Sequence, residues 1–152
     1  RLQQRVEKHP NVASASSMLE KVNVLSVTGL HGSSRALFTV SLFKKRPGTY
    51  LYILNDAETA GYFYHDAVQI MGSERVLFFP SAYKRAAKYG QLDPANLVLR
   101  TEVLTRLQDQ DEPLLIVSYP DALTEKTVSG EHLEKNTLKV KVGDRLDPSF
   151  VS

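Results

Sequence analysis

The strongest constraint on the fold of this chain is the spacing of four short apolar runs along its sequence. The runs span residues 22–27, 50–54, 75–79 and 114–117, and stretches with helical periodicity lie between them. Short, continuous apolar runs are typical of parallel strands that are buried on both faces, and helices connect such strands. The sequence therefore predicts an α/β fold in which helices flank a parallel sheet.

Two of the intervening helices have clear start and stop signals. Ser33 is a suitable cap for the first helix, which ends before Pro47. Asn55 followed by Glu58 resembles a capping box for the second helix, and Gly72 ends it. The stripes expected to face the core are Ala36, Val40 and Phe43 in the first helix and Ala60, Phe63, Ala67 and Ile70 in the second.

A third helix follows the third apolar run after a longer interruption. Residues 80–92 have no clear period, and Asp93-Pro94 then predicts a helix start. Residues 120–123, after the fourth run, suggest a short helical turn. The inner face of the third helix is expected to carry Leu99, Val103 and Leu107.

The chain divides into three expected parts. Residues 1–20 form a helical or linker segment, residues 21–135 form the α/β body, and residues 136–152 open a second, small α+β domain. A polar stretch before Lys135 marks the boundary. Beyond it, residues 138–142 predict a half-buried strand because apolar side chains alternate with lysines. Its residues are Leu138, Lys139, Val140, Lys141 and Val142.

Composition excludes several classes of function. The 152 residues include no cysteine, which excludes disulfides, thiolate metal sites and cysteine nucleophiles, and the histidines show no metal-ligand spacing. No apolar run approaches the roughly 20 residues that a membrane helix needs. The net charge of +2 is too small to create a strong field around the whole molecule. We expect a cytoplasmic protein without membrane contact, in which any nucleic-acid role requires a local basic patch.

The turn before the first helix stands where P-loop ATPases bind phosphate. The sequence there can be compared with the pattern G-x-x-x-x-G-K-[ST]. The first glycine is present, but Ser34 replaces the second glycine, Arg35 replaces the lysine, and Ala36 replaces the hydroxyl residue that holds magnesium. The turn reads Gly29-Leu30-His31-Gly32-Ser33-Ser34-Arg35-Ala36.

We therefore expect no catalytic residue, no metal and no small-molecule substrate or cofactor in this segment. Ala36 cannot coordinate magnesium, and the planar guanidinium of Arg35 is a poor substitute for a compact ammonium. No acidic residue stands at the C-terminal end of the third or fourth apolar run, in residues 78–80 or 116–118. Two alternatives stay open: an aberrant loop that still binds nucleotide, or a helix N-terminus that holds an anion. The residues that would act in either are Gly29, Gly32, Ser33, Ser34 and Arg35.

The order of these features resembles the N-terminal region of bacterial transcription-repair coupling factors. That region is itself a degenerate copy of the B protein of the bacterial excision nuclease, which recognises DNA damage. The resemblance covers almost the whole chain after residue 20 and rests on pattern and order. The segments that carry it are 24–36, 51–58, 76–80, 93–94, 113–118 and 138–146.

The resemblance implies a RecA-like, P-loop-type body that has lost ATPase activity and serves as an interaction scaffold. The implied parent protein is a DNA translocase that removes stalled RNA polymerase and recruits the A protein of the excision nuclease. Its motor domains, elsewhere in the chain, would bind ATP and magnesium. RNA polymerase, the excision nuclease's A protein and DNA are thus implied partners through other parts of the parent. A paralogue of the nuclease's B protein is the alternative.

A second candidate site lies in the irregular stretch after the third apolar run. The excision nuclease's B protein carries a long tyrosine-rich hairpin there that opens DNA, and coupling factors commonly carry an acidic segment with tryptophan. This chain instead interleaves aromatic and cationic side chains, which can stack on bases and neutralise phosphates of single-stranded nucleic acid. A solvated surface is the alternative, because charged runs usually face water. The residues are Tyr83, Lys84, Arg85, Lys88 and Tyr89.

Overall fold

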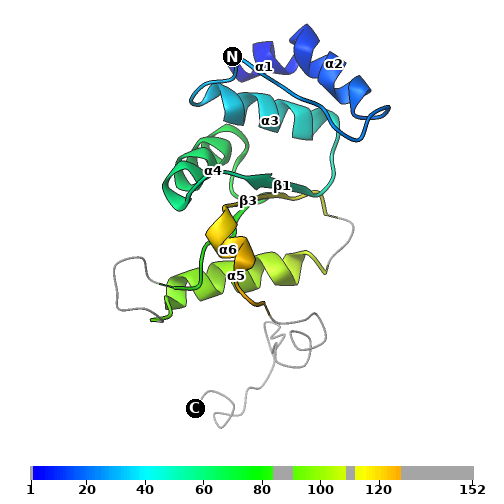
Figure 1. Ribbon diagram of the computed structural model, residues 1–152. Coiled ribbons are helices and arrows are strands. Elements are labelled where there is room, and N and C mark those ends of the chain that lie inside the picture. Colours follow the sequence, from blue (N-terminus) through cyan, green and yellow to red (C-terminus); the bar gives the residue numbers. More distant parts are fainter. Residues whose placement is uncertain (1, 84–90, 109–111, 128–152) are drawn as a thin grey trace, which may run out of the picture.

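The computed structural model describes residues 2–83, 91–108 and 112–127 (Figure 1). The N-terminal segment is helical, as expected, whereas the predicted boundary near Lys135 and the strand at 138–142 lie outside these ranges. In chain order the elements are α1 (Leu2–Glu7), α2 (Pro10–Met18), α3 (Ser34–Lys45), β1 (Tyr50–Ile53), α4 (Ala57–Met71), β2 (Val76–Phe78), α5 (Pro94–Arg106), β3 (Leu115–Ser118) and α6 (Pro120–Thr124).

The three strands form one parallel sheet, which confirms the α/β prediction. Their order is β1-β3-β2, so the last of the described strands lies in the centre. Val117 of β3 is level with Tyr52 of β1 on one side and with Phe78 of β2 on the other. All four residues of β3 are buried. Helices cross over between the strands, as parallel pairing requires.

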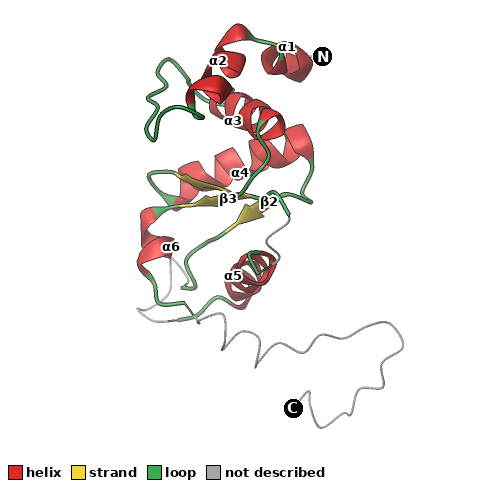
Figure 2. Cartoon of the chain, turned by 90° about the vertical axis from the view of Figure 1, so that its right-hand side faces the viewer, coloured by secondary structure: helices red, strands yellow, loops and turns green. Residues whose placement is uncertain are grey.

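Helices cover the sheet from two sides (Figure 2). The sheet lies between α4 and α5, while α3 packs on α4, and α1 and α2 pack on α3. Aromatic contacts join the layers: the rings of Tyr52 and Phe63 stack with centroids 4.1 Å apart, and Phe43 meets Tyr50 edge-on at 5.4 Å. The core therefore sits mainly between β3, α3 and α4, and it includes the predicted Ala36, Val40, Phe43, Ala60, Phe63 and Ala67.

The prediction of a strand at residues 22–27 is wrong. The segment has no regular structure, and Val24 is 85% exposed. Valine favours strands only where a neighbouring strand pairs with its backbone and other side chains cover it. Within the described ranges no strand pairs with this segment, so its apolar composition alone does not make it one.

The start of α4 differs from the predicted capping box. Asp56, rather than Asn55, is the cap, and its carboxylate accepts a hydrogen bond from the backbone N–H of Thr59 at 2.7 Å. Aspartate satisfies this donor directly, so no reciprocal bond from Glu58 is needed. The predicted end is confirmed, because Gly72 closes the helix with φ of 87°, a value that favours glycine.

The inner face of α5 is rotated from the one predicted. Val103 is buried as expected, but Leu107 is exposed, and Arg100 takes the central buried position. An arginine tolerates such burial only when its donors are paired, and here it donates to carbonyls of the loop after β2 and of α6. The hydrophobic pattern predicted the helix but not which side it turns to the sheet.

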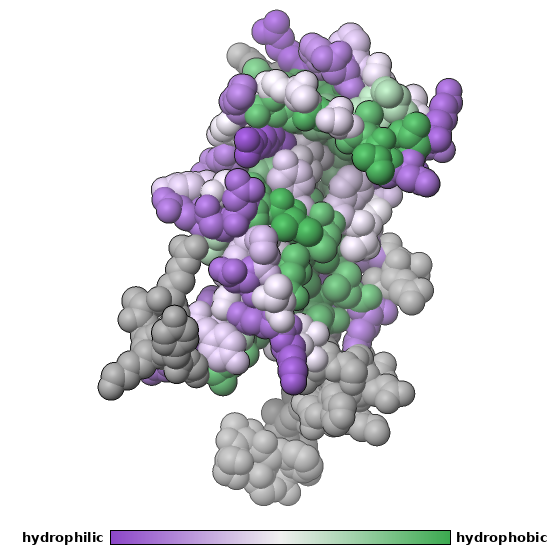
Figure 3. Space-filling model, in the orientation of Figure 1, coloured by the Kyte–Doolittle hydropathy of each residue, from purple (hydrophilic) through white to green (hydrophobic). Residues whose placement is uncertain are grey.

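One edge of the sheet has an exposed apolar surface. Leu51 and Ile53 alternate along β1 and are 52% and 54% exposed, and among the described strands β1 pairs only with β3. Figure 3 shows hydrophobic side chains near the middle of this face, where β1 lies in Figure 1. Parallel strands are normally covered on both faces, so this part of the sheet is less protected than β3.

One surface ion pair joins α1 to α3. The Nζ of Lys44 lies 2.8 Å from Oε1 of Glu7, which also accepts a bond from the side chain of Gln3 at 3.0 Å. The hydrogen bond from Lys44 is the largest cause that lowers the pKa of Glu7 below its usual value. Because this pKa is lower in the folded than in the unfolded chain, ionised Glu7 stabilises the fold at pH values above the ordinary pKa of a glutamate. That stabilisation disappears as the pH falls through the pKa of Glu7 in the folded chain.

We therefore expect Glu7→Gln to lower the free energy of unfolding by about 0.2–1 kcal/mol at neutral pH, since both side chains are partly exposed and screened. The difference from the wild type should shrink as the solution is acidified, which urea unfolding at several pH values measures. Glu20→Gln is the matched control, because Glu20 meets Arg46 at 3.5 Å in a more exposed pair. A Glu7→Gln effect independent of pH would contradict the assignment.

Candidate functional site

The turn before α3 adopts a tight conformation that depends on glycine. Gly29 and Gly32 have φ of 84° and 52°, in the left-handed region that other residues avoid. Ser33 is the cap residue of α3, but its side chain makes no capping bond. The turn therefore leads directly into the first turn of the helix.

The polar groups of this turn bond mainly to one another. The hydroxyl of Ser34 accepts from the backbone N–H of His31 at 2.8 Å and donates to the carbonyl of His31 at 2.7 Å. The backbone N–H of Ser34 donates to the same carbonyl, and that of Arg35 donates to Gly32, each at 3.2 Å. A phosphate loop needs such N–H groups directed at its ligand, and here three of them already have internal acceptors.

The two side chains after Ser34 also make contacts within the fold. Nε of Arg35 donates to the carbonyl of Leu30 at 3.3 Å, within the same turn. Ala36 is only 1% exposed and belongs to the hydrophobic core. The position that holds magnesium in a P-loop therefore faces apolar side chains in this chain.

A cavity of about 480 Å³ lies beside this turn, at the carboxyl end of β1. Its volume falls within the range of small-molecule sites, and ligands of open α/β sheets bind at this end of the strands. It combines a cation, Arg35, with a carboxylate, Asp66, and the exposed ring of Tyr62. The lining residues are Gly32, Ser33, Arg35, Leu54, Thr59, Tyr62, Phe63 and Asp66.

The second predicted site is only partly described. Tyr83 is exposed, and its backbone forms an isolated antiparallel bridge with Leu92. The structure thus brings the two ends of the intervening segment together. The other residues predicted for nucleic-acid contact, Lys84, Arg85, Lys88 and Tyr89, lie outside the described residues.

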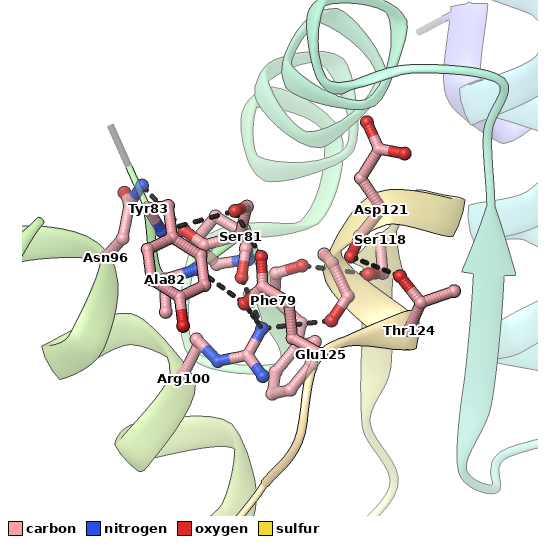
Figure 4. Close-up of polar contacts among 12 residues, drawn as sticks. Phe79, Ser81, Ala82, Tyr83, Asn96, Arg100, Ser118, Asp121, Thr124 and Glu125 are labelled. Carbon is pink, nitrogen blue, oxygen red and sulfur yellow. Dashed lines mark hydrogen bonds and ion pairs between the residues drawn. The ribbon is translucent and has the colours of Figure 1, made fainter. Parts of the chain in front are cut away.

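A buried polar cluster that the sequence did not predict lies beneath Tyr83 (Figure 4). At its centre Nη1 of Arg100 donates to the carbonyls of Pro80 at 2.8 Å and Ala122 at 3.0 Å. The same atom lies 3.3 Å from Oε2 of Glu125. The guanidinium carbon lies 4.2 Å from the centroid of the Phe79 ring, a cation–π contact. Arg100 therefore joins α5 to the ends of both β2 and α6.

The carboxylate of Glu125 completes the cluster. It accepts a bond from the backbone N–H of Ala82 at 2.8 Å and a short bond from the hydroxyl of Ser81. Ser81 is held further by Asn96, whose amide donates to its carbonyl at 2.9 Å, and by Tyr119, whose hydroxyl accepts from its N–H at 2.8 Å. The loop after β2 is thus fixed up to Tyr83, where the second predicted site begins.

In the described ranges no helix is long and apolar enough to cross a membrane. The same ranges contain no group of three or more histidine, aspartate and glutamate side chains that could hold a metal ion. One histidine has a structural role instead: Nδ1 of His9 accepts a hydrogen bond from the N–H of Asn11 at 3.2 Å and so caps α2. The expectations of a cytoplasmic location and of no bound metal remain predictions.

Comparison with known protein families, with curated proteins and with solved structures finds no match to this chain.

We expect the Arg100–Glu125 cluster to stabilise the folded chain. Arg100→Leu removes the cation beside the carboxylate of Glu125, whose side chain is only 15% exposed, and the loss of one partner of a buried pair costs up to about 3–5 kcal/mol. We expect a lower urea midpoint with an unchanged slope. The double variant Arg100→Leu with Glu125→Leu should recover part of the loss, because no uncompensated charge remains.

Lys126→Met is the matched control for this comparison, because it removes a neighbouring positive charge at an exposed position. Its urea midpoint should stay close to that of the wild type. If Arg100→Leu and Lys126→Met lowered the urea midpoint equally, net charge and not the Arg100–Glu125 pair would determine the loss of stability.

Proposed function

We propose that this chain is a non-catalytic interaction module with a RecA-like α/β body, part of a DNA-repair motor similar to transcription-repair coupling factors. In such a motor it would help to link stalled RNA polymerase to excision repair. The parallel sheet with crossover helices is consistent with this class of body. The resemblance over residues 24–36, 51–58 and 113–118 supplies the functional part of the proposal.

The observation that carries the non-catalytic part is the closed hydrogen bonding of the turn before α3. The N–H groups of His31, Ser34 and Arg35 have acceptors within the turn. A nucleotide phosphate would have to displace these bonds before these three N–H groups could bind it. Each internal bond contributes about 0.5–1.5 kcal/mol, so opening the turn would lower phosphate affinity substantially.

Two further features argue against magnesium nucleotide. Asp66 in the wall of the adjoining cavity would repel the negative charges of a triphosphate. Ser118 ends β3 where an ATPase would place an acidic residue, and its hydroxyl donates to the carbonyl of Phe79 at 2.8 Å. The side chain at this position therefore links two strands of the sheet, and we assign it a structural role.

The rival proposal is a P-loop domain that still binds nucleotide, and the cavity beside Arg35 is the observation that favours it. Under the module proposal, ATP and magnesium bind only to motor domains elsewhere in the parent. RNA polymerase, the A protein of the excision nuclease and DNA would be partners of the parent as a whole. The two proposals differ in what Arg35 does, so this residue is the one to vary.

Calorimetric titration of the chain with magnesium-ATP tests the proposal. We expect no heat of binding at millimolar nucleotide, and the same trace for Arg35→Ala. The physical reason is that three N–H donors of the turn already have internal acceptors and that Ala36 is buried. Heat that Arg35→Ala abolishes would show a working nucleotide site and overturn the non-catalytic assignment.

A second experiment tests the linking role in the longer parent that the resemblance implies. Arg100→Leu, which weakens this body, is expected to reduce the coupling of polymerase removal to excision while the motor continues to hydrolyse ATP. Lys126→Met should leave both unchanged. Loss of ATP hydrolysis by Arg100→Leu would mean that the body serves the chemistry of the motor instead.

A further inference from the structure

The outward side of α5 carries a hydrophobic groove that no described element covers. Val98 is 67% exposed, and Leu92 and Leu97 are also exposed. Two hollows, of about 450 Å³ and 410 Å³, share Leu97 and Thr101 in their walls and thus adjoin along the helix. We call this surface the α5 groove and define it by Leu92, Leu97, Val98, Thr101 and Thr105.

The polar groups around the α5 groove are largely satisfied within the fold. The hydroxyl of Thr101 donates to the carbonyl of Leu97 at 2.9 Å. Arg106 at one end binds Glu112 through two hydrogen bonds of 2.6 and 3.2 Å. Arg100 and Glu125 at the other end belong to the buried cluster. The groove therefore favours an occupant with an apolar face over one that brings polar groups to its floor.

The course of the chain identifies the occupant. Lys126 and Thr127 line one of the two hollows, and residues 128–152 follow directly from this wall. Among them, residues 138–142 alternate apolar side chains with lysines. Such a segment offers one apolar side to a groove and one charged side to water. Glu102, in the same wall as Val98, is an exposed carboxylate 3.9 Å from Arg106, and it would lie close to the lysines.

The lengths agree with this placement. Residues 128–137, fully extended, reach about 33–36 Å. The 13 residues of α5 rise over about 20 Å. A five-residue strand spans about 17 Å, which is shorter than α5. The connecting residues are thus long enough to bring residues 138–142 to any part of it.

We propose that residues 138–142 bind in the α5 groove of the same chain, with Leu138, Val140 and Val142 against Leu97 and Val98. Lys139 and Lys141 then face solvent and the side of Glu102. The groove becomes the surface through which the α/β body holds the start of the following domain. This inference rests on the groove and the course of the chain, and it is independent of the proposed function.

The absence of cysteine allows a direct cross-linking test in the full chain. Val98→Cys with Val140→Cys is expected to form an intramolecular disulfide under mild oxidation, because a disulfide requires close Cβ atoms. The matched control pairs Val140→Cys with Tyr62→Cys, an exposed site on α4, across the sheet from α5. The test pair should close at least about tenfold faster than the control pair.

Hydrogen exchange provides a second, independent measurement. The amides of residues 138–142 should exchange at least about tenfold more slowly in the wild type than in Val98→Asp. The amides of β3 should be equally protected in both, because Val98 is largely exposed and its replacement does not disturb the core.

Three results would overturn the proposal. Equal rates of closure for the two cysteine pairs would show that residues 138–142 do not prefer the groove. Cross-links that join two chains, with a dimer in sedimentation, would assign the groove to a second copy. Exchange at 138–142 that Val98→Asp does not alter would place the segment elsewhere.

Discussion

The fold depends on burying β3 between two parallel neighbours. All of its residues are buried, and its backbone pairs with β1 and β2 at once. A strand buried in this way needs cover on both faces of the sheet, which α4 and α5 supply from opposite sides. The positions of the other helices follow, because α3 packs on α4 and the N-terminal pair packs on α3.

The parts of the fold that the sequence predicted are those in which local pattern and burial agree. The runs at 50–54, 75–79 and 114–117 become strands, and the stripe of α3 enters the core. Residues 22–27 have an equally apolar composition but no partner strand among the described residues. Pairing is a property of the assembled sheet, so composition could not separate these cases.

In the candidate site, too, local features could be predicted from the sequence and contacts between distant residues could not. The sequence identified the turn before α3 and its missing chemical groups, because these can be read from residue types at fixed positions. It could not show that Ser34 closes the turn by bonding twice to His31. Nor could it pair Arg100 with Glu125, since they lie on separate elements that meet only in the folded chain. A charged residue in the buried stripe of α5 was the available signal, and its partner left no local pattern.

The bridge between Tyr83 and Leu92 has a consequence for how this fold can vary. The bridge joins the two ends of the segment between these residues, and the Arg100–Glu125 cluster holds the loop that leads into it. Each doubling of a flexible loop adds only about 0.6 kcal/mol of closure cost. A longer connection between Tyr83 and Leu92 would therefore lower the stability of the fold only slightly.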